Sequence, residues 1–433
     1  MFSFLQPYRY GATLRLIDGY PYRLMMSEAV HQTTFTVTHT NVDGTRSGIL
    51  ITSGNKQLIT PNILLYTRHG SVPHITQDLL QDTNNSIIGS INGLHLSLSD
   101  IIALQPPKSY YTQPNNNTSA TNTLHSYLQL QQYIFYFSLY DNILYDNTLV
   151  NDSGVTINSI QGKHKITSNE YHTCINKFQP ELICSMNDSL DTYKYNNTSV
   201  YSKNRIRKCI ERNIQWLEQC ADSAAADDTY KPLITINLSH LQFLSDDTQS
   251  IYYNEIQSRD TLYHGIVLPP LYQPYKQTQT QQHSMIHKFD SSKLRIQQCS
   301  GSVLDVLYSV YNGCDLIQSN YSYTCTQLGY ASTFIYQPND KYRPDKLNMH
   351  DKLYESDSAP LLDNCSCYAC THHTRSYIHH LLNVHELVAE ILLQIHNTHH
   401  YVLFIQTVQH HVQNNTYQQY FNDMLNLYQP RSQ

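Results

Sequence analysis

The chain has 433 residues, of which 40% are hydrophobic and 14% charged, and its formal net charge at pH 7 is −6. This length suits one large domain, including an α/β barrel with insertions, or two ordinary domains. Nucleic-acid binders that act alone are usually basic, so the negative net charge argues against a strong stand-alone DNA or RNA binder. It does not exclude a local basic patch.

No targeting or membrane segment is expected. Residues 1–10 lack an apolar stretch long enough for a signal peptide, and no run of about 18 apolar residues predicts a membrane span. We therefore expect a cytoplasmic protein. Three of the ten cysteines form a tight group, which in such a chain favours metal binding and buried thiols over disulfides.

The N-terminal part is expected to form short strands. Residues 35–38 and 49–51 have strand character, and Asp43-Gly44 between them is a turn signal. The short apolar run at 63–66 predicts a strand that is buried on both faces.

Strands and helices then alternate. We expect helices at 168–178 and 203–220, a strand region at 155–166 with a turn at Gln161-Gly162, and short buried strands at 182–184, 233–236 and 265–268. Trp216, the only tryptophan, lies beside the apolar face of the second helix and is expected in the core. This alternation predicts βαβ units and a parallel sheet or barrel. Three polar stretches, 106–123, 271–292 and 336–360, are expected to be loops or insertions.

The strongest motif is Cys365-x-Cys367-x-x-Cys370, whose three thiols are soft ligands that suit zinc. A structural zinc site requires a fourth ligand, and His396 follows Cys370 by 26 residues. The segment between them has apolar residues at helical spacing, which predicts one long helix with His396 at its far end. Spacing alone also leaves His385, His399 and His400 open as the fourth ligand. Three buried cysteines without metal, or a catalytic zinc, are the alternatives.

The cysteine motif, the run RSYIHHLL at 375–382 and His396-Asn397 together resemble the C-terminal zinc subdomain of tRNA-guanine transglycosylases. This resemblance selects His396 as the fourth ligand. The run LLYTRHGSVPHIT at 64–76, then Gln179-Pro180, Cys184 and the helix start at 205–208, resemble the accessory-subunit branch of the eukaryotic queuine tRNA-ribosyltransferases. The likeness extends in ordered pieces from about residue 64 to about residue 401.

The resemblance implies a (β/α)8 TIM-type barrel with N-terminal antiparallel strands and a C-terminal zinc-binding subdomain. The expected division is 1–335 for the barrel with its N-terminal strands, 336–360 for a polar insertion loop, and 361–433 for the zinc subdomain and C-terminal helices. It also implies one structural Zn²⁺ per subunit and a heterodimer with a catalytic subunit. Since dimers of this family pack around the zinc subdomain, the helix expected at 375–395 is the interface candidate.

In that family an aspartate attacks the ribose carbon, and the complex exchanges guanine for queuine at the wobble position of tRNAs with GUN anticodons. The resemblance further implies contact with tRNA through the complex and peripheral association with the mitochondrial outer membrane. Arg205, Arg207, Lys208 and Arg212 could contact tRNA phosphate or a partner, or form a solvated helix face.

Several residues depart from the catalytic pattern. The family's Asp-Ser-Gly-Gly-Phe-Gln run is absent, and its nearest counterpart is 138–142, which contains Asp141. The nucleophile position falls on Gln318, although Asp315 remains three residues earlier, and 237–240 lacks the Gly-Gly pair for the base. We therefore expect a non-catalytic accessory subunit with no catalytic residues and no organic cofactor. The alternatives are a base-exchange enzyme that uses Asp315 or Asp141, and a zinc-dependent interaction module unrelated to tRNA.

The sequence does not assign one role to two further groups of residues. Arg68 and His74 lie beside a predicted strand end, where catalysis occurs in active barrel enzymes, so an interface or structural role is equally expected. His379-His380 and His399-His400 are expected around the metal ligands or on the surface.

Overall fold

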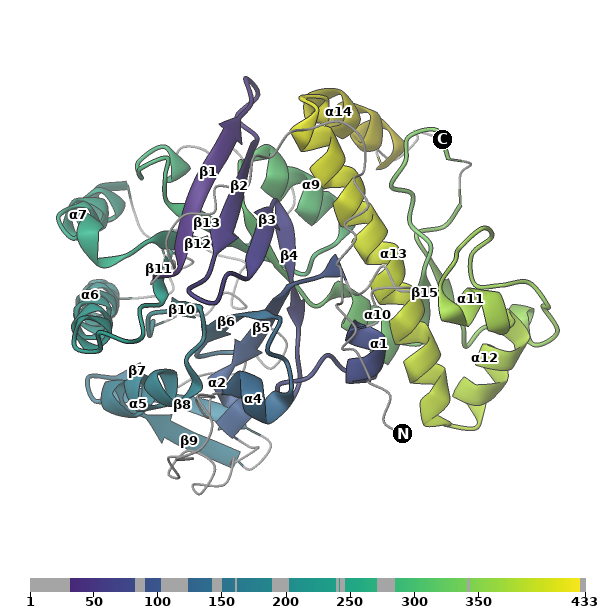
Figure 1. Cartoon of the computed structure of the whole chain (residues 1–433), viewed down its shortest axis with the longest axis horizontal. Coiled ribbons are helices and arrows are strands. Elements are labelled where there is room, and N and C mark those ends of the chain that lie inside the picture. Colours follow the sequence, from purple (N-terminus) through teal and green to yellow (C-terminus); the bar gives the residue numbers. More distant parts are fainter. Residues whose placement is uncertain are drawn as a thin grey trace, which may run out of the picture.

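The structure, a computed structural model, describes residues 32–81, 90–102, 124–141, 150–159, 162–188, 202–238, 241, 246–270, 285–340 and 343–428. Eight parallel strands form a closed barrel in which each strand pairs with the next along the chain and the last pairs with the first (Figure 1). In order, they are β4 (Asn62–Tyr66), β5 (Gly93–Ser97), β6 (Ile134–Ser138), β10 (Leu182–Cys184), β11 (Leu233–Asn237), β12 (Gly265–Leu268), β13 (Leu294–Gln298) and β14 (Leu316–Ser319). The predicted (β/α)8 barrel is thus confirmed.

Each barrel strand is buried on both faces because its side chains alternate between the barrel interior and the surrounding helices. Leu64 and Tyr136 belong to the interior cluster, whereas Ile63 and Leu65 pack in the outer core beneath the helices. The helices along the barrel sequence are α1 (Gln77–Gln81), α2 (Leu98–Ile101), α4 (Leu124–Leu128), α5 (Ser168–Phe178), α6 (Lys203–Ala225), α7 (Asp246–Gln257), η4 (Asp260–Leu262), α9 (Val303–Tyr311) and α10 (Tyr321–Gln327).

An antiparallel sheet closes the end of the barrel at which its strands begin. It consists of β1 (Thr34–Thr40), β2 (Arg46–Ile51) and β3 (Gln57–Thr60), in that order. Leu50 and Leu58 from this sheet are fully buried in the same cluster as the barrel interior, so the sheet acts as a floor. A second antiparallel sheet, β7 (Val150–Asn151), β8 (Gly154–Ser159) and β9 (Gly162–Ile166), follows β6 and packs on α2 through β8.

The C-terminal part packs against α10 and the first barrel strand. It contains β15 (Tyr330–Ser332), β16 (Lys346–Asn348), η5 (Lys352–Tyr354), α11 (Tyr368–His372), α12 (Arg375–Asn383), α13 (Leu387–Gln413) and α14 (Tyr417–Tyr428). Within 336–360, β16 pairs with β15, and Leu347, Met349 and Tyr354 are buried. The division of the chain into domains stays a prediction.

The single long helix expected up to His396 is wrong, because the chain turns after α12. Glu386 N–H donates to the Leu381 carbonyl at 2.9 Å and His385 N–H to the Leu382 carbonyl at 3.2 Å, while His385 has a positive φ of 57°. These two bonds around a left-handed residue form a Schellman cap, which ends α12. His396 therefore lies in the third turn of α13 and not at a helix end.

Of the loop expected at 271–292, residues 271–284 lie outside the described residues. In the remainder, Met285, Ile286 and Phe289 are buried in the outer core. The loop expected at 106–123 lies outside the described residues. None of the helices in the described ranges combines the length and the hydropathy that a membrane span requires.

Candidate metal centre and barrel mouth

The three cysteines and His396 come together in the C-terminal part. The distances from His396 Nδ1 to the sulfurs of Cys365, Cys367 and Cys370 are 3.8, 3.5 and 3.4 Å. All four ligand atoms lie within 4.8 Å of one another, so this group could hold a metal ion. Hydrogen bonds from Cys367 and Cys370 lower the pKa of the Cys365 thiol, whereas contacts with Cys365 and Cys370 raise the pKa of the Cys367 thiol, so the three sulfurs act as one group.

Local structure positions each ligand. Cys367 caps the start of α11, and its sulfur accepts a hydrogen bond from Cys370 N–H at 3.4 Å. His396 is fully buried, and its Nε2 lies 2.9 Å from the Ser332 carbonyl on β15. Because that carbonyl can only accept, Nε2 carries the proton and Nδ1 presents its lone pair to the three sulfurs.

The neighbours of His396 on α13 extend this attachment to β15. Asn397 Oδ1 accepts from Ser332 N–H at 2.7 Å, and its Nδ2 donates to the Tyr330 carbonyl at 2.9 Å. One turn later, His400 Nε2 lies 2.9 Å from the Phe334 carbonyl. These buried polar side chains fix the rotation of α13 and therefore the direction in which His396 points.

The other histidines considered as fourth ligand have different surroundings. His385 is exposed in the turn between α12 and α13, and His399 faces Ser366 Oγ at 3.4 Å. His379 Nδ1 lies 2.8 Å from the Met349 carbonyl, and His380 is exposed. Ser332 and Asn397 were not expected as supports of the site, since Ser332 precedes the cysteine motif by more than thirty residues and has no spacing relation to it.

Asp315 lies at the floor of the barrel, immediately before β14. Its carboxylate is fully buried in an ion pair with Arg46 on β2, in which Arg46 Nε donates to Oδ1 at 2.9 Å and Nη2 to Oδ2. Oδ2 also accepts from Arg295 N–H at 2.7 Å. In TIM barrels catalysis takes place at the opposite end, where the strands finish. The arrangement therefore makes Asp315 a structural anchor for the floor sheet.

Gln318 occupies the mouth half of β14. It is 2% exposed and pairs in register with Leu64 of β4, beside the buried phenol of Tyr136. An uncharged amide at this position can donate and accept hydrogen bonds, but it offers no carboxylate that could attack a ribose carbon.

Asp141 and Asp100 are buried carboxylates at the barrel mouth. Asp141, after β6, accepts a hydrogen bond from the Tyr66 hydroxyl at 2.7 Å. Asp100, in α2 after β5, accepts from His69 N–H, and its pKa is raised by burial. Asp100 is 2% exposed, and its Oδ1 has no hydrogen-bond partner.

The loop after β4 connects the mouth to the C-terminal part. Arg68 Nη1 donates to the Tyr323 hydroxyl at 3.1 Å, and the His74 ring stacks on the same tyrosine. His74 Nδ1 also lies 3.5 Å from Glu390 Oε2 on α13. Arg68 and His74 thus support the junction between the barrel mouth, α10 and the start of α13.

The basic residues of α6 divide into two groups. Arg205 donates two hydrogen bonds to the fully buried Asp188, at 2.6 and 2.5 Å, and Arg212 connects Asp188 to Asp152. Arg207 and Lys208 are exposed. The predicted solvated helix face therefore consists of Arg207 and Lys208 only. Arg205 and Arg212 instead neutralise Asp188, an aspartate after β10 that the sequence did not identify. Trp216 is buried, as expected.

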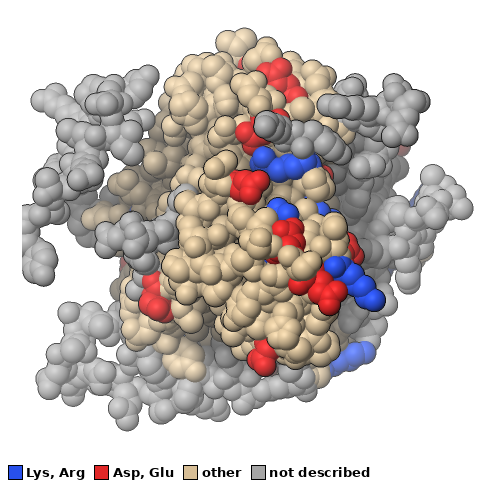
Figure 2. All heavy atoms as spheres, turned by 90° about the vertical axis from the view of Figure 1, so that its right-hand side faces the viewer, with Lys and Arg blue, Asp and Glu red and all other residues tan. Residues whose placement is uncertain are grey.

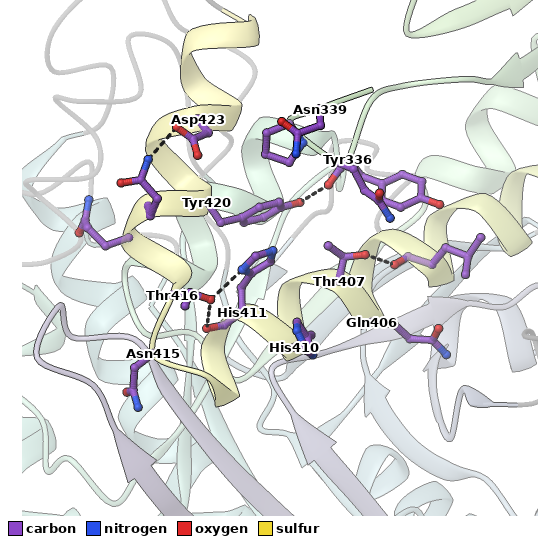
Figure 3. A pocket seen from close by; sticks show the side chains of 15 residues that line it. Tyr336, Asn339, Gln406, Thr407, His410, His411, Asn415, Thr416, Tyr420 and Asp423 are labelled. Atoms are coloured by element: carbon purple, nitrogen blue, oxygen red, sulfur yellow. Dashed lines mark hydrogen bonds between the residues drawn. The ribbon is translucent and has the colours of Figure 1, made fainter. Parts of the chain in front are cut away.

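A separate groove of about 1010 Å³ lies between α13, α14 and residues 336–339 (Figure 3). Tyr420 donates to the Tyr336 carbonyl at 2.8 Å, and His411 Nδ1 lies 2.8 Å from Thr416 Oγ1 at its base. Six of its fifteen lining residues are Asn or Gln, and Asp423 is its one acidic residue among those described.

Comparison with known proteins identifies relatives along almost the whole chain. The model of a family described as Queuine tRNA-ribosyltransferase matches residues 42–430. A queuine tRNA-ribosyltransferase accessory subunit 2 from Ixodes scapularis is 26% identical over 384 residues, which cover 84% of this chain and 92% of the relative. Proteins of the same name from Xenopus tropicalis and Schizosaccharomyces pombe are each 25% identical over 84% of this chain, and over 93% and 77% of their own lengths.

Proposed function

The chain belongs to the queuine tRNA-ribosyltransferase family, and from that membership we propose that it is a non-catalytic accessory subunit. It pairs with a catalytic subunit, and the complex exchanges guanine for queuine at the wobble position of tRNAs with GUN anticodons. Peripheral association with the mitochondrial outer membrane belongs to the same proposal and rests on the resemblance alone.

The observation that carries this proposal is the chemistry of β14. Gln318 stands at the position that resembles the family nucleophile, and Asp315, the nearest carboxylate on that segment, is buried at the other end of the barrel against Arg46. Moving Asp315 to the mouth would leave Arg46 unpaired inside the protein, which costs about 3–5 kcal/mol. Base exchange therefore falls to the partner.

We propose zinc as the metal and Cys365, Cys367, Cys370 and His396 as its four ligands. A tetrahedral zinc with Zn–S of about 2.3 Å and Zn–N of about 2.0–2.1 Å places sulfur and nitrogen about 3.6 Å apart. The three sulfur–nitrogen distances of 3.4 to 3.8 Å fit this geometry. Because four protein ligands fill the coordination shell, the ion is structural and ties α11 to α13.

The catalytic partner is proposed to dock on the face around the metal ligands. Six of the ten large hydrophobic side chains that are exposed in the described ranges lie between residues 353 and 388: Leu353, Tyr368, Tyr377, Val384, Leu387 and Val388. Figure 2 views the molecule from this side, and much of the described surface lacks Lys, Arg, Asp and Glu. The six side chains come from η5, α11, α12 and the start of α13, which pack against one another, and exposed apolar side chains on neighbouring elements are typical of a protein interface.

The decisive experiment measures incorporation of labelled queuine into tRNA by this chain alone, by the catalytic subunit alone and by the mixture. We expect activity only in the mixture. Activity of this chain alone would overturn the proposal. Loss of that activity in Asp141→Asn or Asp315→Ala, in a variant that keeps its thermal midpoint, would then identify the carboxylate responsible. Failure to bind the catalytic subunit would favour an interaction module with another partner.

A further inference from the structure

The chain is acidic overall, but two of its segments are strongly basic. Residues 150–166 and 203–212 together carry seven of the 28 Lys and Arg residues and only two of the 34 Asp and Glu residues. The first segment forms the sheet β7–β9, and the second forms the first turns of α6. A quarter of the positive charge is therefore concentrated in two short elements.

The fold joins these two elements into one surface. Arg212 on α6 donates to Asp152 in the turn between β7 and β8, at 2.9 and 2.6 Å, and Lys165 on β9 donates to Ser153 in the same turn at 2.6 Å. Lys208 lies one turn before Arg212, and its charge is near enough to help lower the pKa of Asp152 after the larger effects of Arg212. The lysines of β9 and the cations of α6 thus flank the same turn.

Five of the seven cations are exposed, and we call them the basic patch: Lys163, Lys165, Lys203, Arg207 and Lys208. Arg205 and Arg212 are excluded because Asp188 and Asp152 occupy them. Lys163 and Lys165 share the outer face of β9, because the alternate residues His164 and Ile166 pair with the buried Ile157 and Val155. Arg207 has only a long, exposed contact with Glu211, at 3.7 Å.

Positive charges meet at the N-terminus of α6, which is unfavourable unless an anion binds there. The first turn of α6 contains no acidic residue and begins with Lys203, although the N-terminus of a helix carries a partial positive charge. Cations there are repelled by this partial charge, and a bound phosphate would remove the repulsion.

The patch lies at the mouth side of the barrel. Arg205 binds Asp188, which follows the end of β10, so the first turns of α6 lie beside that strand end. The sheet β7–β9 packs through β8 on α2, which follows the end of β5. A nucleic acid that approached the mouth would therefore meet both halves of the patch.

We propose that the basic patch binds the phosphate backbone of the tRNA on which the complex acts, so that this subunit contacts the nucleic acid itself. The inference rests on the proposed function and adds a partner surface to it. An anionic membrane is the less favoured occupant, since membrane-surface elements place large apolar side chains beside their cations. No exposed large hydrophobic residue occurs in the described parts of these two segments.

The test measures binding of a labelled tRNA with a GUN anticodon to the heterodimer over a range of salt concentrations. The triple variant Lys203→Gln, Arg207→Gln and Lys208→Gln removes three charges from exposed positions. The double variant Lys163→Gln and Lys165→Gln removes two from a separate element. The control, Lys177→Gln, Lys288→Gln and Lys346→Gln, makes the same charge change as the triple variant at exposed sites elsewhere.

We expect the triple variant to raise the Kd about tenfold and to reduce the slope of log Kd against log salt by about 2, because each lost phosphate contact lowers that slope by about 0.7–0.9. The double variant should also raise the Kd and reduce the slope, and the control variant should match the wild type in both. In queuine incorporation, KM for tRNA should rise while kcat at saturating tRNA stays unchanged.

Wild-type Kd and slope in both patch variants would overturn the inference. A second contrary result would be patch variants that keep tRNA binding but no longer bind vesicles of phosphatidylcholine and phosphatidylserine in equal parts. That result would assign the patch to a membrane. A separate measurement tests the proposed function. If that function is wrong, mixing the wild-type subunits will not increase queuine incorporation.

Discussion

Glu181 joins three segments of the chain at the floor of the barrel. It precedes β10, and its carboxylate binds Lys56 from the turn between β2 and β3, His125 Nε2 at 3.2 Å and Phe135 N–H at 2.8 Å. Burial alone would raise its pKa, but the hydrogen bonds and charges of His125 and Lys56 outweigh burial and lower the pKa to about 2. The ionised form is therefore the one that the folded state favours.

This pKa predicts how stability depends on pH. Since the folded value lies below the unfolded value of about 4.5, the contribution of Glu181 is complete above pH 4.5 and is lost as pH falls from there towards 2. We expect Glu181→Gln to lower the free energy of unfolding by about 3 kcal/mol at pH 7, measured by urea denaturation. Between pH 5 and pH 3, the free energy of unfolding of this variant should change less with pH than that of the wild type. Parallel curves would contradict this role.

The sequence predicted the positions of single residues unevenly. The zinc-ligand motif selected three cysteines by local spacing, and the family resemblance selected His396. Asp188 and Ser332 had no such signal, because the groups they bind, on α6 and α13, lie far along the chain. Buried ion pairs and hydrogen bonds of this kind depend on how elements pack, which local periodicity does not specify.

At the scale of elements, strands and helices with clear periodicity were predicted well, and their ends less so. The turn between α12 and α13 escaped prediction because His385, and not glycine, adopts the left-handed conformation that closes the Schellman cap. The apolar spacing continues across the turn, so the pattern resembled one helix. A second turn of this type, with Asn415 at φ 57°, separates α13 from α14.

The metal centre predicts how α11 depends on α13. Cys367→Ser replaces a thiolate ligand with a poor one, so we expect zinc, measured by atomic absorption, to fall well below one ion per chain. Without the ion, α11 should lose its fixed position, and the yield of heterodimer in size-exclusion chromatography should fall.

His410→Ala is the matched control, since it removes a histidine of α13 that is exposed, helical and outside both the ligand group and the proposed interface. It should keep both zinc and pairing. Normal heterodimer yield from zinc-free Cys367→Ser would separate the metal centre from the interface.

At the scale of the whole molecule, the apolar face around α12 and the start of α13 predicts where the partner binds. Leu387 is 61% exposed in the first turn of α13, where an aspartate suits the helix dipole. Leu387→Asp should therefore keep the fold, with an unchanged thermal midpoint, and weaken heterodimer formation at least about tenfold, measured by analytical ultracentrifugation.

Ile251→Asp provides the comparison, because Ile251 is also 61% exposed but lies on α7, outside the proposed interface. It should pair normally. Equal weakening by both substitutions would show that the effect is not specific to the proposed face.

The pairing of β14 with β4 has a consequence for synthesis on the ribosome. The first and last barrel strands are joined at Asn62 and Leu316, so a nascent chain cannot close its barrel until residue 319 has emerged. Until then the strands at both ends of the growing sheet expose unpaired backbone groups, which are prone to pair with other chains. The floor hairpin waits longer still, because Asn41 on its turn donates to the carbonyl of Val412 at 3.0 Å. The protein should therefore need chaperone protection for most of its translation, and messages cut short before β14 should yield aggregates instead of a smaller folded domain.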